Sequence, residues 1–175
     1  MMPPYAGVGS RSSPPDVLAT MAALAAALAA AGWTLRSGHA PGADQAFERG
    51  AGAAADIFLP WPGFEAETPA VGRVFPFPSA AAYTVAARHH PAWDRLSSAA
   101  RALHARNAHQ ALGPNLDMPA AFLLCWTPGA QVVGGTGQAI RIAQAHAVPV
   151  LNLADPEVLK RAEAWLASPA TAPPR

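Results

Sequence analysis

Short apolar segments alternate with helical segments along most of this chain, and this alternation limits the folds that it can adopt. The apolar segments expected to form strands are 5–8, 33–36, 56–59, 120–126 and 148–153. Helical spacing or a glycine-rich turn follows most of them. Strands that are joined by helices form parallel sheets with helices on both faces. The sequence therefore predicts an α/β fold, a single three-layer domain with a mainly parallel sheet.

The chain has 175 residues, which is enough for one domain with an apolar core. We expect this domain to span residues 1–168 and a flexible tail to follow at 169–175. Residues 60–92 break the alternation, because prolines occur at 60, 62, 69, 76, 78 and 91. Long irregular connections in compact domains are often lids or binding loops. We therefore predict a proline-rich lid or insertion at 60–92, followed by a helix from about Trp93 to Leu112.

Charge and cysteine content exclude several classes of protein. The 12 Lys and Arg residues nearly balance the 11 Asp and Glu residues, so the net charge of +1 gives no general attraction to nucleic acid. Cys125 is the single cysteine, which excludes an internal disulfide and a four-cysteine zinc site. No apolar run reaches the roughly 20 residues of a membrane span. We expect a cytoplasmic protein with no membrane contact, no metal site and no cofactor.

Three glycine-rich turns follow predicted strands. Their candidate ligand-binding residues are Gly9, Ser10 and Arg11 after the first strand; Ser37, Gly38, Gly42 and Asp44 after the second; and Gly134, Gly135, Thr136, Gly137 and Gln138 after the fourth. Glycine lets backbone N–H groups approach a phosphate closely, and a helix N-terminus adds a favourable dipole. One such turn alone is an ordinary tight turn. Because the carboxyl ends of parallel strands meet at one edge of a sheet, three turns predict a shared anion site.

Several side chains near these turns have both a binding and a structural interpretation. Arg11 either adds a guanidinium fork to the anion site or is a solvated loop charge. Asn107 interrupts an apolar stripe on its helix, so its amide binds either backbone groups or a ligand, and Arg106 lies beside it. Trp126, directly after the fourth strand, is a candidate for stacking on a base. Glu48 is expected at the surface.

The chain resembles the SLOG superfamily of Rossmann-like nucleotide-binding proteins in three segments: YAGVGSR at 5–11, RSGHAPGADQAFERGA at 36–51 and GGTGQAIRIA at 134–143. This superfamily includes the DNA-processing DprA family and the LOG phosphoribohydrolases. The first two segments are similar to the DprA pattern, in which a GSR turn is followed by SG-x-A-x-G-x-D. The resemblance implies a Rossmann-like fold, a nucleotide ligand and assembly as a homodimer or higher homo-oligomer.

LOG enzymes hydrolyse the N-glycosidic bond of a nucleoside monophosphate, and their motifs match this chain in part. Arg106 matches the arginine of the helix motif M-H-E-R-K, whereas Arg141 stands at the position of the catalytic glutamate in P-G-G-x-G-T-x-x-E. An arginine can neither stabilise an oxocarbenium-like state nor activate water. The candidate catalytic residues are therefore Arg106 and Asp44, the latter as a replacement carboxylate. Binding a ribose hydroxyl and stabilising the first turn of its helix are the alternative roles of Asp44.

Three functions remain open at this point. The first is binding of a small phosphorylated nucleotide or nucleotide derivative through the converging glycine-rich turns. The second is nucleoside-monophosphate N-glycosidase activity with a non-standard catalytic acid. The third is DprA-like binding of single-stranded DNA. DNA binding needs a local basic patch, and the candidate residues for such a patch are Arg11, Arg36, Arg106 and Arg141.

Overall fold

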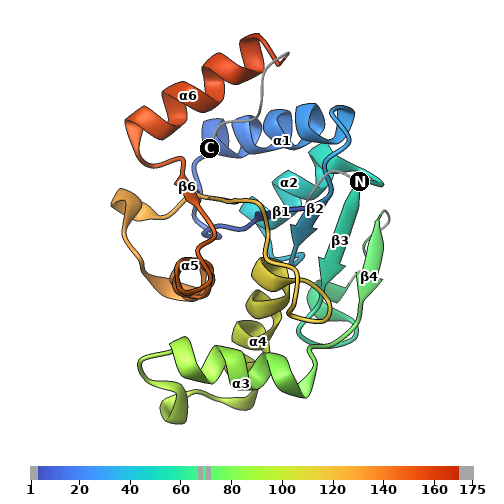
Figure 1. The fold of residues 1–175 in the computed structure, drawn as a ribbon, viewed down its shortest axis with the longest axis vertical. Helices are drawn as coiled ribbons and strands as arrows, with labels where there is room; N and C mark the ends of the chain where they lie inside the picture. The colour runs from blue at the N-terminus through green and yellow to red at the C-terminus, as the bar shows by residue number, and fades with distance from the viewer. Residues whose placement is uncertain (1–3, 67–68, 70–71, 170–175) are drawn as a thin grey trace.

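The computed structural model describes residues 4–66, 69 and 72–169, which form a three-layer α/β structure. All strands of its six-stranded sheet are parallel, in the order β4-β3-β2-β1-β5-β6. In chain order the strands are β1 (Tyr5–Gly7), β2 (Leu35–Ser37), β3 (Ala55–Phe58), β4 (Arg73–Phe75), β5 (Leu123–Cys125) and β6 (Val150–Asn152) (Figure 1). The predicted α/β fold with a parallel sheet is confirmed.

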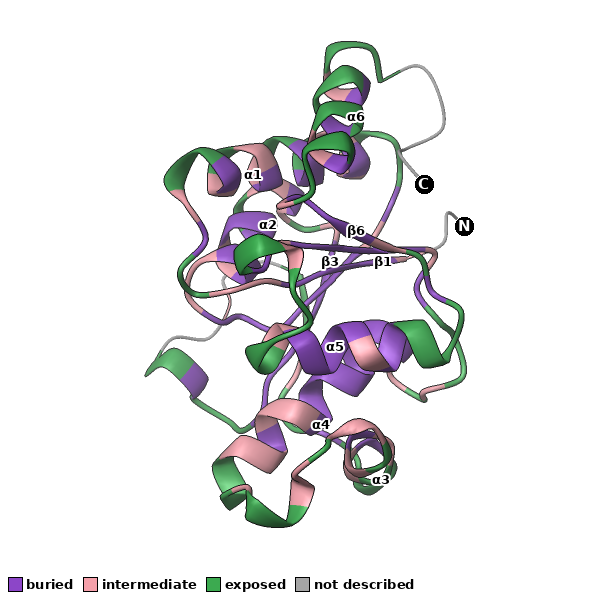
Figure 2. Ribbon diagram, turned by 90° about the vertical axis from the view of Figure 1, so that its left-hand side faces the viewer, coloured by how far each residue is buried: buried purple, intermediate pink, exposed green. Residues whose placement is uncertain are grey.

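Helices cover both faces of the sheet (Figures 1 and 2). One face carries α1 (Pro15–Ala30), α2 (Ala43–Ala51) and α6 (Pro156–Ala167). The opposite face carries α3 (Ala80–His89), α4 (Ser98–Leu112) and α5 (Gly134–Ala145). In the described part of the chain, no helix is both long and apolar enough to cross a membrane.

The apolar run at 120–126 is continuous because its strand is buried on both faces. Successive side chains of a strand point to opposite faces of the sheet. Phe122 and Leu124 pack in the core beneath α1 and α2, whereas Leu123 and Cys125 pack beneath α5. A central parallel strand therefore needs apolar residues at every position.

The proline-rich segment contains two elements that the sequence analysis did not predict. β4 pairs with β3 at the edge of the sheet, and Arg73 of β4 donates to both carboxylate oxygens of Asp56 at 3.0 and 2.9 Å. Helix α3 begins after Ser79, whose Oγ accepts a hydrogen bond from the N–H of Ala82. Residues 67–68 and 70–71 of the predicted lid, and 170–175 of the predicted tail, lie outside the described residues.

The helix predicted from Trp93 begins five residues later. Trp93–Arg95 forms a short 3-10 turn, and α4 begins at Ser98. Ser97 is its N-cap, because the Ser97 Oγ accepts from the N–H of Ala100 at 3.2 Å. Serine is a preferred N-cap residue, so this boundary was readable from the sequence.

Candidate functional site

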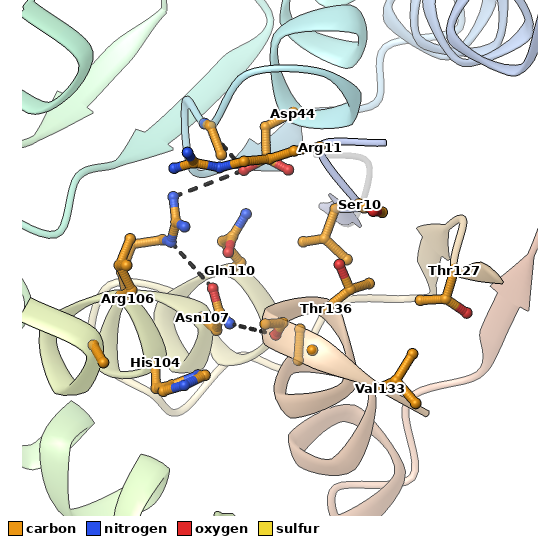
Figure 3. A pocket seen from close by; sticks show the side chains of 18 of the residues that line it. Ser10, Arg11, Asp44, His104, Arg106, Asn107, Gln110, Thr127, Val133 and Thr136 are labelled. Atoms are coloured by element: carbon orange, nitrogen blue, oxygen red, sulfur yellow. Dashed lines mark hydrogen bonds and ion pairs between the residues drawn. The ribbon is translucent and has the colours of Figure 1, made fainter. Parts of the chain in front are cut away.

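A cavity of about 500 Å³ lies beyond the carboxyl ends of the central strands. β1 lies between β2 and β5, and the helices that follow β1 and β5 cover opposite faces of the sheet. Ligands of open α/β sheets bind at such a switch point. The lining residues are Val8, Gly9, Ser10 and Arg11 after β1; Ala40 and Asp44 after β2; Ala100, Leu103, His104, Arg106, Asn107 and Gln110 on α4; and Thr127, Pro128, Val133, Gly134, Gly135, Thr136 and Ala139 after β5 (Figure 3).

The first turn contributes a small polar wall. Ser10 Oγ accepts from the N–H of Ser12 at 3.1 Å and lies 2.8 Å from Ser12 Oγ. The Arg11 side chain is 61% exposed, and its guanidinium forms an ion pair with Glu65 at 3.2 Å. An exposed ion pair contributes little to stability. Arg11 can therefore exchange Glu65 for an anion at the cavity mouth.

The third turn opens α5 and leaves free space in front of it. A Cβ built on Gly134 or Gly135 meets no atom within 4 Å, and Val133 at the N-cap provides no side-chain hydrogen bond. The first N–H groups of a helix have no partner within the helix. Gly134, Gly135 and Thr136 therefore present backbone donors and a favourable dipole beside the cavity.

Gly137 and Gln138 of the same turn do not line the cavity. A Cβ on Gly137 would lie 2.8 Å from the backbone carbon of Val132. Gln138 is fully buried, and its Nε2 donates to the carbonyl of Ala86 on α3 at 2.8 Å. Its Oε1 accepts from Arg141 at 3.0 Å. These residues hold α5 against α3 rather than facing the space between the turns.

The second turn acts mainly through its backbone. The Gly38 carbonyl accepts a hydrogen bond from Arg106, and a Cβ on Gly38 would overlap that guanidinium. Ser37 Oγ donates to the carbonyl of Asp44 at 3.4 Å. Gly42 has a φ of +88° and is the N-cap of α2. Of this predicted set, Asp44 lines the cavity, whereas Ser37, Gly38 and Gly42 shape the turn behind it.

A chain of buried polar contacts joins the second turn to the third (Figure 3). Arg106 lies 3.7 Å from Asp44 Oδ2, and its Nε donates to Asn107 Oδ1 at 3.1 Å. Asn107 Nδ2 in turn donates to the carbonyl of Gly135 at 3.0 Å. Arg106 and Asn107 are only 5% and 6% exposed. Both residues therefore fix the spacing between the second and third turns.

Burial shifts the titration of Asp44. Its pKa rises from the ordinary 3.8 to about 6, mainly because burial disfavours the charged form, while Arg106 opposes the shift and Glu48 adds to it. Glu48 is buried, so its predicted surface position is wrong. Its carboxylate accepts from the backbone N–H of His39 at 2.9 Å and lies 2.6 Å from His39 Nδ1. These contacts explain the burial, because a buried carboxylate needs partners.

Sequence reasoning missed two polar lining residues on α4, Gln110 and His104. Gln110 is 1% exposed, and neither polar atom of its side chain has a hydrogen-bond partner among the described residues. His104 also lines the cavity. Burial, followed by the positive charge of neighbouring groups, lowers its pKa to about 4. The signal for Gln110 was the spacing 100, 103, 107 and 110, which places one helical face toward the cavity.

The four arginines of the predicted basic patch do not gather. Arg11 and Arg106 line the cavity, but Arg36 donates to the carbonyl of Met118 at 2.7 Å, and Arg141 donates to the carbonyl of His89 at 2.9 Å. Trp126 packs against the core on the α1 side and is not among the lining residues. Within residues 4–66, 69 and 72–169, no group of three or more His, Cys, Asp or Glu side chains could hold a metal ion.

No protein-family model and no curated protein matches the chain. Solved structures of two proteins illustrate the shared fold. DNA processing protein A from Helicobacter pylori, which has a single-stranded DNA binding mode, aligns with a TM-score of 0.59 and 15% identity over 94% of this chain and 79% of its own. The Moco carrier protein of Chlamydomonas rheinhardtii aligns with a TM-score of 0.51 and 19% identity over 91% of this chain and 81% of its own. These likenesses establish a Rossmann-like fold for the chain.

Proposed function

We propose that this protein binds a small phosphorylated nucleotide or nucleotide derivative in the cavity between the three turns. The observation that carries the proposal is the meeting of residues from all three turns around one space of about 500 Å³. Small-molecule sites range from roughly 300 to 1,000 Å³. A single mononucleotide suits a space of this size, and the fold belongs to a class whose ligands lie at this edge of the sheet.

In this proposal the phosphate binds at the N-terminus of α5. The turn from Gly134 to Thr136 supplies backbone donors, and the open space in front of both glycines admits the phosphate oxygens. Ser10 and Arg11 approach from the opposite wall and add a hydroxyl and a mobile cation. Arg106 stays with Asp44 and Gly38, so its role is to neutralise the floor of the site.

The test is Gly135→Val, which places a branched side chain where the phosphate is expected. Isothermal titration with AMP, GMP, CMP and UMP should show binding to the wild-type protein and at least about 10-fold weaker binding to the variant. The unliganded variant should keep its melting temperature, because a Cβ at this position meets no neighbour within 4 Å. Ala23→Val, at an exposed position of α1, is the control and should bind normally. Unchanged affinity in Gly135→Val would overturn the phosphate position.

Hydrolysis of the N-glycosidic bond is the second candidate function, and Asp44 is the observation that favours it. A carboxyl with a pKa of about 6 at the cavity floor can both donate and accept a proton near neutrality. We propose that Asp44 protonates the leaving base as the C1′–N bond breaks. Water then adds to C1′ and returns a proton to Asp44, which yields ribose 5-phosphate and the free base. Arg141 takes no part, since it lies against α3.

The hydrolysis proposal is tested by incubating the four nucleoside monophosphates with the protein and separating free base by chromatography. Release of base by the wild type, and its loss in Asp44→Asn, is the expected pair of results. Titration of the variant with the same nucleotide shows whether the site still binds. No base release from a nucleotide that binds would leave binding as the function and would remove the catalytic role of Asp44.

Single-stranded DNA fits this cavity less well than a mononucleotide. Strand binding requires exposed cations along a groove. Arg106 is buried and paired, and Arg36 and Arg141 are held by backbone carbonyls away from the cavity. Among the residues that line the cavity, Arg11 is the exposed arginine. We therefore propose the mononucleotide as ligand in preference to a DNA strand.

A further inference from the structure

Gln110 has an unusual environment for a buried amide. The residue is 1% exposed and lines the cavity, and Figure 3 shows it on α4 between Arg106 and Thr136. Neither Nε2 nor Oε1 has a hydrogen-bond partner in the described part of the chain. Buried polar side chains in native proteins nearly always have partners, because an unpaired donor or acceptor destabilises the fold. A ligand in the cavity is the natural source of these partners.

The amide and guanidinium groups next to Gln110 on α4 are already engaged, whereas His104 Nδ1 on the same helix also has no partner among the described residues. Asn107 uses its oxygen to accept from Arg106 and its nitrogen to donate to Gly135. Arg106 is bound to Gly38 and paired with Asp44. Gln110 is therefore the buried amide of this helix face that has both a free donor and a free acceptor.

The chemistry of an amide narrows the group that it can bind. Ionised phosphate oxygens only accept hydrogen bonds, so phosphate would leave Oε1 without a donor. A nucleobase edge carries a donor beside an acceptor at the spacing of a side-chain amide, as in glutamine pairing with adenine. Val8, Leu103 and Ala139 add apolar wall to the same cavity, which suits a flat ring.

We propose that Gln110 recognises the base of the bound nucleotide through a paired hydrogen bond, with Nε2 donating and Oε1 accepting at one edge of a planar nitrogen heterocycle. This assignment rests on the proposed function, because it presumes that the phosphate of the same ligand lies at α5. In this proposal, different residues recognise the two ends of the ligand. Gln110 sets the preference among bases, and the turn from Gly134 to Thr136 sets the requirement for phosphate.

The test compares AMP, GMP, CMP, UMP and ribose 5-phosphate by isothermal titration against wild-type protein and Gln110→Leu. At least one nucleotide should bind the wild type about 10-fold more tightly than ribose 5-phosphate, since two hydrogen bonds and ring contacts separate the probes. Gln110→Leu should lose this margin and keep its affinity for ribose 5-phosphate. Gln110→Glu should change the order of the bases, because a carboxylate offers no donor.

Stability provides an independent readout. Replacing an unpartnered buried amide by leucine should leave the melting temperature of the unliganded protein unchanged or raise it. Asn107→Leu is the matched control and should lower it, because the Asn107 amide makes two hydrogen bonds. A lower melting temperature in Gln110→Leu would show a structural role for Gln110 and would contradict the proposal.

Other outcomes separate this proposal from the proposed function. If Gln110→Leu keeps the full margin between nucleotide and ribose 5-phosphate, or weakens both equally, base recognition by Gln110 is wrong and phosphate binding stands. If ribose 5-phosphate binds the wild type as tightly as every nucleotide, the same conclusion follows. If Gly135→Val binds every probe as the wild type does, the phosphate position in the proposed function is wrong. If no probe binds the wild type, both proposals have failed.

Discussion

The polar residues around the cavity differ in whether other groups of the protein already bind them. Arg106 and Asp44 form a buried ion pair, so removing either charge leaves the other unpaired in a medium that disfavours it. Sequence reasoning identified Asp44 from the second glycine-rich turn, Arg106 from its match to the LOG helix motif, and Asn107 because it interrupts an apolar stripe on its helix. It missed Gln110, because the sequence does not show whether a buried amide has partners within the protein.

The opposite shifts of Asp44 and His104 predict opposite effects on stability in acid. The pKa of Asp44 rises from 3.8 to about 6. Its contribution to the free energy of unfolding is therefore present below about pH 4 and is lost as pH rises through 6. The pKa of His104 falls from 6.5 to about 4, so its contribution is present above pH 6.5 and is lost as pH falls through 4. Between these limits the two groups oppose each other.

Urea unfolding of two variants between pH 4 and 7 measures these contributions. Relative to the wild type, Asp44→Asn should gain free energy of unfolding as pH rises from 4 to 6. His104→Gln should gain it, relative to the wild type, as pH falls from 6.5 to 4. The measured quantity is the difference in free energy of unfolding between variant and wild type, followed as a function of pH. A variant that is less stable by the same amount at every pH does not change this pH dependence. Differences that do not change with pH would contradict the assigned shifts.

At the scale of elements, the sequence predicted the strands and helices that have strong local signals. The apolar run at 120–126 and the glycines that open α5 are examples. β4 and α3 were missed for physical reasons. β4 is a three-residue edge strand between prolines, and its pairing with β3 depends on contacts distant in sequence. Helix α3 is rich in alanine, so its apolar face shows little contrast with the rest of the helix.

The position of each residue in α5 also determines which part of the third turn faces the cavity. Gly134 and Gly135 stand at the start of α5 with open space before them, whereas Gly137 and Gln138, within the same helix, face inward. The sequence analysis predicted that all four of these residues belong to one anion-binding turn. Side-chain direction along a helix changes by about 100° per residue, so neighbours in sequence need not share a face.

In the molecule as a whole, the cavity depends on the order in which the chain forms its strands. The turns after β1, β2 and β5 lie far apart in sequence, and the parallel sheet brings their ends to one edge. This convergence could be predicted, because it follows from strands joined by helices on both faces. The contacts that hold the turns at a fixed separation could not, since they run through Arg106 and Asn107 on α4. SLOG membership and assembly as a homo-oligomer stay predictions.

A nuclear magnetic resonance titration of the backbone amides with a nucleoside monophosphate shows whether the first and third turns bind the same phosphate. We predict saturable shifts that are largest for Ser10, Arg11, Gly134, Gly135 and Thr136, because the backbone donors at α5 and the Ser10 and Arg11 side chains of the first turn would share one phosphate. Ala23 and the rest of the exposed face of α1 should not shift. Saturable shifts confined to one turn, or centred on the α1 and α6 side of the sheet, would contradict a common phosphate site between the turns.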